Sequence, residues 1–208
     1  MPIDMMVHLN GHRLCAIDVE TTGLDHSYHE IVQVSMIALN EKLDPHPGYQ
    51  IFDVLVKPLY PERASKEAIR KIGRDKFNSA VATGYDPTVA FELWENWFQS
   101  LSMGEGRRVT PLGYNYANFD SNFLRQWAGF ETYNYYFDTR VRDPFLIANW
   151  FNDRADFAGE KQPFPNLKLR QICRKLGVPF DPDAAHDSLY DAQKTAEAYK
   201  KLMTEIIV

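Results

Sequence analysis

The sequence predicts an α/β domain in which helices pack in layers against a mixed β-sheet. Several apolar, β-branched segments of strand length lie close together near the N-terminus. After Pro61 the apolar residues recur with helical spacing, and strand-like segments then alternate with helices. At 208 residues one domain is expected, so we predict a single domain over residues 1–208 with a core from about residue 13 to residue 205.

Five segments are predicted as strands from their length and their apolar or β-branched side chains. The first three follow one another closely, which predicts an antiparallel meander, and the other two are separated by helices. In chain order the segments are residues 13–20, 31–39, 49–56, 109–115 and a short strand around Tyr136.

Helices are predicted where apolar residues follow a helical period between capping and breaking residues. Gly73 should end the first helix, Asp86 precedes the second, and Asn118 should cap the third. Residues 153–165 contain two prolines and a glycine and are expected to form an exposed loop. The predicted helices are residues 62–72, 87–101, 118–127, 144–151, 167–176 and 188 to near the C-terminus.

Nothing in the sequence predicts export or membrane insertion. No apolar run approaches the roughly 20 residues that cross a bilayer, and the N-terminus lacks the basic start and apolar block of a signal peptide. Cys15 and Cys173 lie far apart within apolar stretches, which favours buried thiols over a disulfide. We therefore expect a cytoplasmic protein.

Two acidic residues lie at the end of the first predicted strand, RLCAIDVE. Because side chains alternate across a strand, Asp18 and Glu20 share one face with Leu14 and Ala16. Neighbouring like charges are costly unless a cation or a proton shares the site. A bound metal ion explains the pair, and a solvated strand end is the alternative.

A third acidic residue, Asp120, lies in the segment NYANFDSNFLRQW. Phe119, Phe123 and Trp127 recur at helical spacing and should face the core, which places Asp120 in the first turn of a helix. An acid at this position also stabilises a helix through its dipole. Asp120 taken alone therefore does not indicate a site.

The C-terminal segment HDSLYDAQKTAEAYKKL is predicted as an amphipathic helix docked on the sheet. Asp191 borders the apolar stripe of this helix, where its side chain can reach the sheet edge. His186 lies five residues earlier, and a lone histidine is more often structural than catalytic. The functional interpretation therefore depends on the three clusters taken together.

The three clusters, DVETTGLD, GYNYANFDSNFL and AHDSLYDAQKTAEAY, resemble the motifs of the DnaQ-like, or DEDDh, superfamily of 3′→5′ exonucleases. The resemblance extends from Arg13 to about Leu202. It implies a ribonuclease H-like fold, with a five-stranded mixed sheet flanked by helices, and release of nucleoside 5′-monophosphates. The implied catalytic residues are four acidic metal ligands and a histidine general base: Asp18, Glu20, Asp120, Asp191 and His186.

The mechanism that this set suggests uses two metal ions. Asp18 would bridge both ions, Glu20 and Asp191 would complete the site that activates water, and Asp120 would hold the second ion. Oxygen-rich ligands without cysteine favour Mg²⁺, with Mn²⁺ as a substitute. His186 would accept the proton of the attacking water.

The resemblance also suggests residues that contact the substrate. Thr21, Thr22 and Leu24 occupy the stretch that touches the terminal nucleotide in the superfamily, and Asn115 and Tyr116 stand where many members have His-Asn. The string GYNxxxFD is similar to bacterial exonuclease I, which degrades single-stranded DNA, and AHDSLYDAQKTA equally resembles ribonuclease T, which trims RNA ends. We predict single-stranded nucleic acid 3′ ends as the substrate, with DNA favoured over RNA.

Three alternatives stay open: an RNA-trimming exoribonuclease of the ribonuclease T or oligoribonuclease type, a proofreading exonuclease with a separate polymerase, and a non-catalytic binding module. The net charge of −5 argues against nucleic-acid binding, but two bound divalent cations would reduce it to −1. Six basic residues are candidates for phosphate contacts: Arg107, Arg108, Arg125, Arg140, Arg142 and Lys168.

Overall fold

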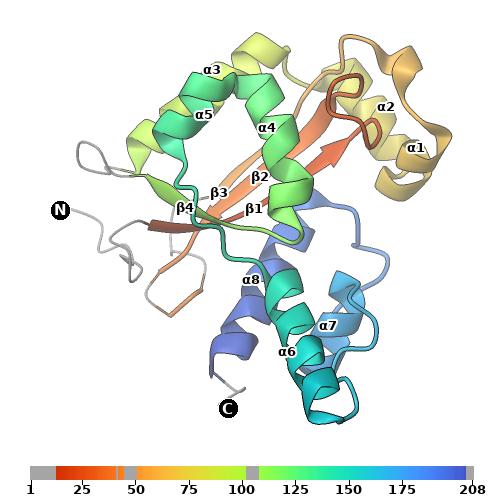
Figure 1. The fold of residues 1–208 in the computed structure, drawn as a ribbon. Coiled ribbons are helices and arrows are strands. Elements are labelled where there is room, and N and C mark those ends of the chain that lie inside the picture. The colour runs from red at the N-terminus through yellow and green to blue at the C-terminus, as the bar shows by residue number, and fades with distance from the viewer. Residues whose placement is uncertain (1–12, 41, 45–50, 102–107, 205–208) are drawn as a thin grey trace.

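The computed structural model describes residues 13–40, 42–44, 51–101 and 108–204. Within them, four strands form one mixed sheet in the order β3-β2-β1-β4 (Figure 1). The strands β1 (Arg13–Thr21), β2 (Ile31–Ala38) and β3 (Ile51–Leu55) form the predicted antiparallel meander. The shorter β4 (Val109–Leu112) pairs parallel to β1, which makes the sheet mixed. The α/β class is confirmed; residues 49 and 50 of the third predicted strand lie outside the described residues.

The prediction of a fifth strand around Tyr136 is wrong. Residues up to Tyr136 form a helix, and the chain then touches β4 only at two single bridges, from Phe137 to Val109 and from Arg142 to Leu112. Between the two bridges the segment after this helix advances five residues, from Phe137 to Arg142, whereas β4 advances three, from Val109 to Leu112. The two backbones therefore cannot stay in register as a ladder. Pro111 also lacks the N–H that a continuous ladder requires.

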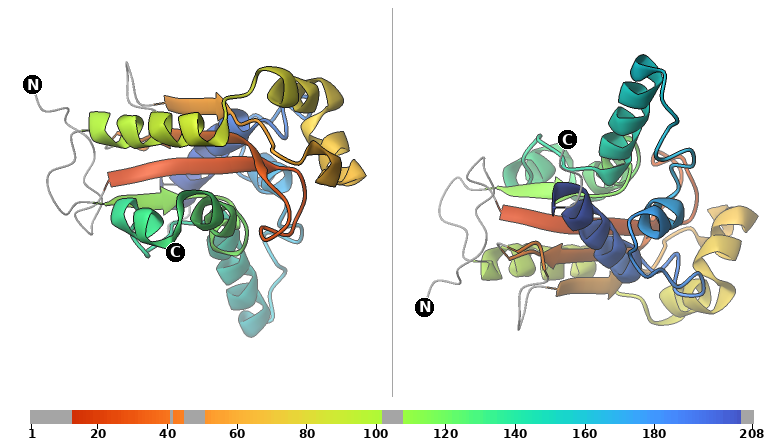
Figure 2. Two further views of the ribbon diagram at one scale, coloured as in Figure 1. Left: turned by 90° about the horizontal axis from the view of Figure 1, so that it is seen from above. Right: turned by 90° about the horizontal axis from the view of Figure 1, so that it is seen from below.

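The helices cover both faces of the sheet (Figure 2). On one face α3 (Pro87–Ser100) and α4 (Asp120–Ala128) pack against Cys15, Ile17 and Val19 of β1, with Trp94 at the centre of this aromatic-rich core. On the other face α8 (Ser188–Thr204) crosses the sheet and packs against Leu14. The helices are α1 (Lys66–Ile72), α2 (Arg74–Thr83), α3 (Pro87–Ser100), α4 (Asp120–Ala128), α5 (Phe130–Tyr136), α6 (Pro144–Ala158), α7 (Leu169–Lys175) and α8 (Ser188–Thr204).

The first predicted helix, residues 62–72, is divided in the structure. A 3₁₀ turn (Pro61–Arg63) comes first, and α1 begins only after Ser65, whose side chain accepts a hydrogen bond from the Ala68 amide. Such a capping serine has an extended backbone, which interrupts a helix. Helix α2, which begins directly after Gly73, was not predicted from the sequence. This glycine has φ +91°, a value that lets the chain turn sharply between two helices.

Other helix boundaries also differ from the prediction, by one or two residues in α3 and α7 and for a physical reason in α4 and α6. Asn118 does not cap α4, because it belongs to a 3₁₀ turn (Tyr116–Asn118) and Phe119 stands at the cap position. Helix α6 extends to Ala158, so the predicted loop over residues 153–165 begins only at Gly159. Gly159 adopts the left-handed conformation that commonly ends a helix.

Cys15 and Cys173 are both buried free thiols, as predicted. Among the described residues, no helix combines the length and the hydropathy needed to span a membrane.

We expect Leu112→Ala to lower the free energy of unfolding by about 2–5 kcal/mol, because a fully buried leucine leaves a cavity between the sheet and α8. Leu146→Ala is the matched control, since Leu146 is 52% exposed on α6 and should change stability by less than about 0.5 kcal/mol. Urea denaturation measures both values. Equal losses in the two variants would contradict this assignment of the core.

Candidate active site

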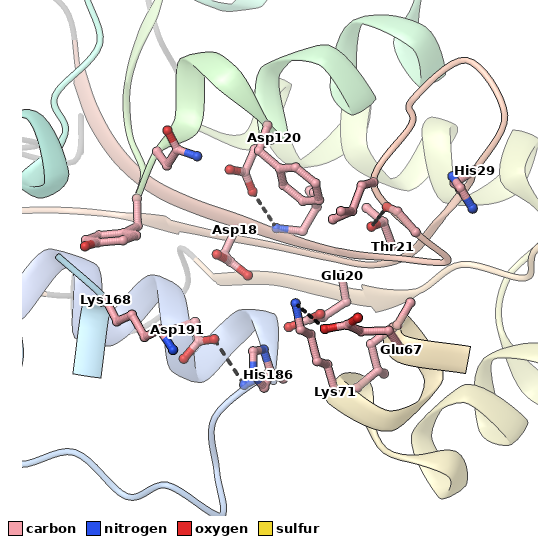
Figure 3. A pocket seen from close by; sticks show the side chains of 18 of the residues that line it. Asp18, Glu20, Thr21, His29, Glu67, Lys71, Asp120, Lys168, His186 and Asp191 are labelled. Carbon is pink, nitrogen blue, oxygen red and sulfur yellow. Dashed lines mark hydrogen bonds and ion pairs between the residues drawn. The ribbon is translucent and has the colours of Figure 1, made fainter. Parts of the chain in front are cut away.

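Acidic residues from three separate elements meet at the C-terminal end of β1 (Figure 3). Asp18 and Glu20 project from β1, Asp120 is the first residue of α4, and Asp191 lies in the first turn of α8. His186 lies in the loop before α8. All five residues line one pocket with a volume of about 840 Å³. The structure therefore brings together the whole predicted catalytic set.

The strand geometry of β1 explains why two of the carboxylates lie together. The neighbours of Asp18 in the period-two pattern, Leu14 and Ala16, contact α8, so Asp18 and Glu20 face the same side of the sheet. The register between β1 and β2 shifts between Glu20 and Thr21, where the strand ends. The carboxylates therefore lie where the sheet opens to the pocket.

A polar network fixes the start of α8 on this face of the sheet. The Ser188 amide donates to Oε1 of Gln33 at 3.3 Å, and the hydroxyls of Ser35 and Ser188 are hydrogen-bonded to each other. Gln33 and Ser35 both donate to Oδ1 of Asp53, at 2.9 and 2.7 Å. This network determines where α8 places Asp191, one turn later.

Asp120 reaches the pocket from the opposite side. Its Oδ1 accepts a hydrogen bond from the Val19 amide at 3.0 Å, and the residue is only 2% exposed. This contact ties the start of α4 to the strand that carries Asp18 and Glu20. A first-turn acid that only stabilised its own helix would not need this long-range bond.

His186 lies close to two of the carboxylates. Potential ligand atoms of Glu20, His186 and Asp191 all lie within 4.8 Å of one another. The His186 amide donates to Oδ2 of Asp191 at 3.1 Å, and His186 has φ +64°, a left-handed conformation that is rare for a non-glycine residue. Such local strain is concentrated at functional sites.

Burial, with a smaller contribution from neighbouring carboxylates, raises the pKa of the four acidic residues of the site. Burial, followed by repulsion from Asp120 and Glu20, raises the pKa of Asp18 well above its usual value. Burial is also the main cause of the raised pKa of Glu20 (about 8), Asp120 (about 7) and Asp191 (about 6). These groups therefore retain protons near neutral pH, which a bound cation would displace.

The site fits a divalent cation. Its donors are carboxylate oxygens and one imidazole without cysteine, which suits Mg²⁺ or Mn²⁺. Oδ1 of Asp191 is buried and has no hydrogen-bond partner in the described part of the chain. A buried hydrogen-bond acceptor without a partner is costly. A bound cation would give this carboxylate oxygen the partner that it lacks.

Three of the five residues predicted to contact the substrate line the pocket, and two do not. Thr21, Leu24 and Asn115 line the pocket. The side chains of Thr22 and Tyr116 do not, because both are buried: the Thr22 hydroxyl accepts from the Glu30 amide, and the Tyr116 hydroxyl bonds that of Tyr133.

Several pocket residues were not found from the sequence. They come from the 24–29 loop, α1, α6 and the loop before α7, which only the tertiary fold brings to the site: His29, Ser65, Glu67, Lys71, Phe145, Asn166 and Leu167. Of the six basic candidates for phosphate contact, Lys168 lines the pocket; Arg107 lies outside the described residues.

The chain is similar to known exonucleases in sequence and in fold. A family model described as an exonuclease, RNase T, matches residues 15–199. Ribonuclease T of Hahella chejuensis is 28% identical over 187 residues, which cover 88% of this chain and 79% of the relative. The PolC-type DNA polymerase III of Ureaplasma parvum is 23% identical over 203 residues, which cover 96% of this chain and 12% of the polymerase.

Among solved structures, a zinc-bound complex of E. coli exonuclease I with single-stranded DNA aligns with a TM-score of 0.71 and 16% identity. The alignment covers 94% of this chain, which spans only 41% of the exonuclease I chain. At this identity the likeness establishes the shared fold. It confirms the predicted fold class, with four strands in the described residues where five were expected.

We expect the metal-free protein to lose stability as the pH rises from about 5 to about 8. Glu20, Asp120 and Asp191 have a raised pKa when folded, against about 4 when unfolded, so the folded state binds more protons in this window. A divalent cation replaces those protons. The rise in Tm caused by Mn²⁺ should therefore be larger at pH 8 than at pH 5, and Asp191→Asn should reduce the difference. Calorimetry with EDTA or Mn²⁺ tests this, and an equal rise at both pH values contradicts it.

Proposed function

Since the chain belongs to the RNase T exonuclease family and is a DnaQ-like 3′→5′ exonuclease, we propose that it shortens single-stranded DNA and releases nucleoside 5′-monophosphates. The observation that carries this proposal is the meeting of Asp18, Glu20, Asp120, Asp191 and His186 in one pocket. Carboxylates of this kind and a neighbouring imidazole are the groups that phosphodiester hydrolysis requires.

The four carboxylates are proposed to hold two Mg²⁺ ions, for which Mn²⁺ can substitute. We assign Asp18, Glu20 and Asp191 to one ion, and Asp18 together with Asp120 to the other. When bound, the ions would neutralise charge on the phosphate and lower the pKa of the attacking water. The hydrogen bond from the Val19 amide would hold Asp120 in the orientation that this role needs.

His186 is proposed as the general base, accepting a proton from water at an imidazole nitrogen. Its pKa is lowered by partial burial and by the positive charges of Lys71 and Lys76, which keeps the ring neutral and able to accept a proton at neutral pH. The side chain is exposed to the pocket, where water can reach it.

The rest of the pocket suits a strand end. Leu24 is 77% exposed, and together with Phe119 and Phe145 it offers apolar surface on which unpaired bases can pack. Lys71 and Lys168 bring positive charge to the same pocket, where the backbone phosphates would lie (Figure 3). Neither feature distinguishes the 2′-hydroxyl of RNA.

The relatives support different substrates. The single-stranded DNA complex of exonuclease I favours DNA, whereas the name of the Hahella relative, ribonuclease T, favours RNA trimming as the second candidate. The similarity to a PolC-type polymerase supports a proofreading role with a separate polymerase as a third. We propose DNA first because the motif GYNxxxFD matches exonuclease I.

We also infer one exonuclease domain and a cytoplasmic location. The family match over residues 15–199 covers nearly all the described elements, which supports a single domain. Burial raises the pKa of both cysteine thiols, to about 12 for Cys173, so both stay reduced and unreactive, as suits a reducing compartment.

Asp18→Asn and Asp191→Asn should each abolish nucleotide release, because the proposed metal sites lose a charged ligand. His186→Ala should slow hydrolysis by about 10²- to 10⁴-fold while metal binding persists. A time course with 5′-labelled oligonucleotide and Mg²⁺ measures the rates, and calorimetric titration with Mn²⁺ measures binding. Glu131→Gln, on the exposed surface of α5, is the control. Full activity in EDTA, or in Asp18→Asn, would refute the two-metal proposal.

Matched single-stranded DNA and RNA oligonucleotides should be digested from their 3′ ends, with kcat/KM higher for DNA. The comparison uses one sequence, one 5′ label and one Mg²⁺ concentration, so that only the 2′-hydroxyl differs. Faster digestion of RNA would replace the DNA proposal with the RNA-trimming alternative. A duplex with a mismatched 3′ end tests the proofreading alternative in the same assay.

A further inference from the structure

We propose that Lys76 of α2 is a positioning residue that holds the loop carrying His186 in its catalytic conformation. This inference rests on the proposed function of His186. Lys76 does not line the active-site pocket. It lies behind the loop, so it can affect hydrolysis without touching the nucleic acid.

The Lys76 ammonium has three acceptors on two other segments. Its Nζ lies 2.6 Å from Oδ2 of Asp187, 3.2 Å from the carbonyl oxygen of His186 and 3.3 Å from Oε1 of Gln33. A lysine has three N–H donors, so each can serve one of these acceptors. The side chain is 23% exposed, which shields the contact with Asp187 from much of the solvent.

The His186 loop needs such a restraint. His186 has φ +64°, which costs free energy for a residue with a side chain, and it persists only where surrounding contacts enforce it. Lys76 binds the carbonyl of this same residue, and Asp191 binds its amide. The two contacts together fix the peptide groups on both sides of the His186 side chain.

The neighbouring residues connect this restraint to the rest of the fold. Asp187, the ion-pair partner of Lys76, also accepts a hydrogen bond from the Tyr190 amide in the first turn of α8. Gln33 is 4% exposed on β2 and accepts from both Lys76 and the Ser188 amide. Lys76 therefore joins α2, β2 and the start of α8 at the point where the imidazole is placed beside Glu20 and Asp191.

Lys76→Met is the test variant, because it removes the charge and the donors but keeps the length of the side chain. Asp187 is a poorer choice, since changing it also removes the contact with Tyr190. Lys200→Met is the matched control. Lys200 forms an ion pair of the same 2.6 Å with Asp44, a residue 156 positions away in the chain, and it does not line the pocket.

In single-stranded oligonucleotide digestion with Mg²⁺, Lys76→Met should lower kcat by about 10- to 100-fold, the loss expected when a catalytic group is displaced by about 1 Å. KM should change by less than about twofold, because substrate contacts are intact. Hydrogen exchange of metal-free protein should be faster in the peptide that contains residues 186–191. Lys200→Met should leave kcat and this exchange unchanged.

A double-mutant cycle separates this role from a general loss of stability. In a His186→Ala background and at saturating Mg²⁺, which removes any effect of Lys76 on the charge of Glu20, Lys76→Met should change kcat by less than about twofold, because the residue acts through the histidine. A full loss in that background, or a rise in KM with kcat unchanged, would overturn the proposal. If Lys76→Met does not fold, Lys76→Gln, which keeps an N–H donor but no charge, replaces it; kcat should then fall by about 3- to 10-fold, because one hydrogen bond to the loop can persist.

The same experiment keeps the two proposals apart. If the unmodified chain releases no nucleotide in Mg²⁺, or if His186→Ala retains full activity, the proposed function fails. The exchange measurement then still decides whether Lys76 holds the loop. If His186→Ala is slow but Lys76→Met has normal kcat and normal exchange, the positioning role alone fails.

Discussion

Repulsion among buried carboxylates is the constraint on which the arrangement of this protein depends. Burial raises the pKa of Asp18, Glu20, Asp120 and Asp191, and repulsion from neighbouring carboxylates raises each of them further. A chain that only needed to fold would separate these groups or pair each with a base. The fold instead keeps them together, so part of its packing free energy opposes their repulsion when no cation is bound.

The groups that oppose this repulsion come from outside the acidic cluster. The Val19 amide stabilises Asp120, the His186 amide stabilises Asp191, and Lys76 lowers the pKa of Glu20 from a position behind the site. Two of these donors are backbone amides, which no substitution except proline removes. The α8 end of the site is further secured by buried contacts between β2 and Ser188.

Local periodicity was enough to predict much of this protein. The alternation in β1 correctly placed Asp18 and Glu20 on one face, and the apolar stripe of α8 correctly placed Asp191 at the sheet. What the sequence could not provide depends on tertiary contacts. The position of Lys71 in the same pocket as the carboxylates follows from the placement of α1, and the burial of Tyr116 is accompanied by its bond with Tyr133. The prediction of a fifth strand was wrong for two reasons. The residues up to Tyr136 form α5, and the residues after it are out of register with β4.

The two bridges beside β4 have a consequence for self-association. An uncovered sheet edge is a template for strands of other molecules. Here the Asp138 and Arg142 amides donate to the Val109 and Pro111 carbonyls, and the Gly113 amide donates to the Arg142 carbonyl. These bonds occupy the outer edge of β4 with irregular backbone that cannot extend the sheet. The irregular segment from Phe137 to Arg142 therefore protects this edge of the sheet from edge-to-edge aggregation.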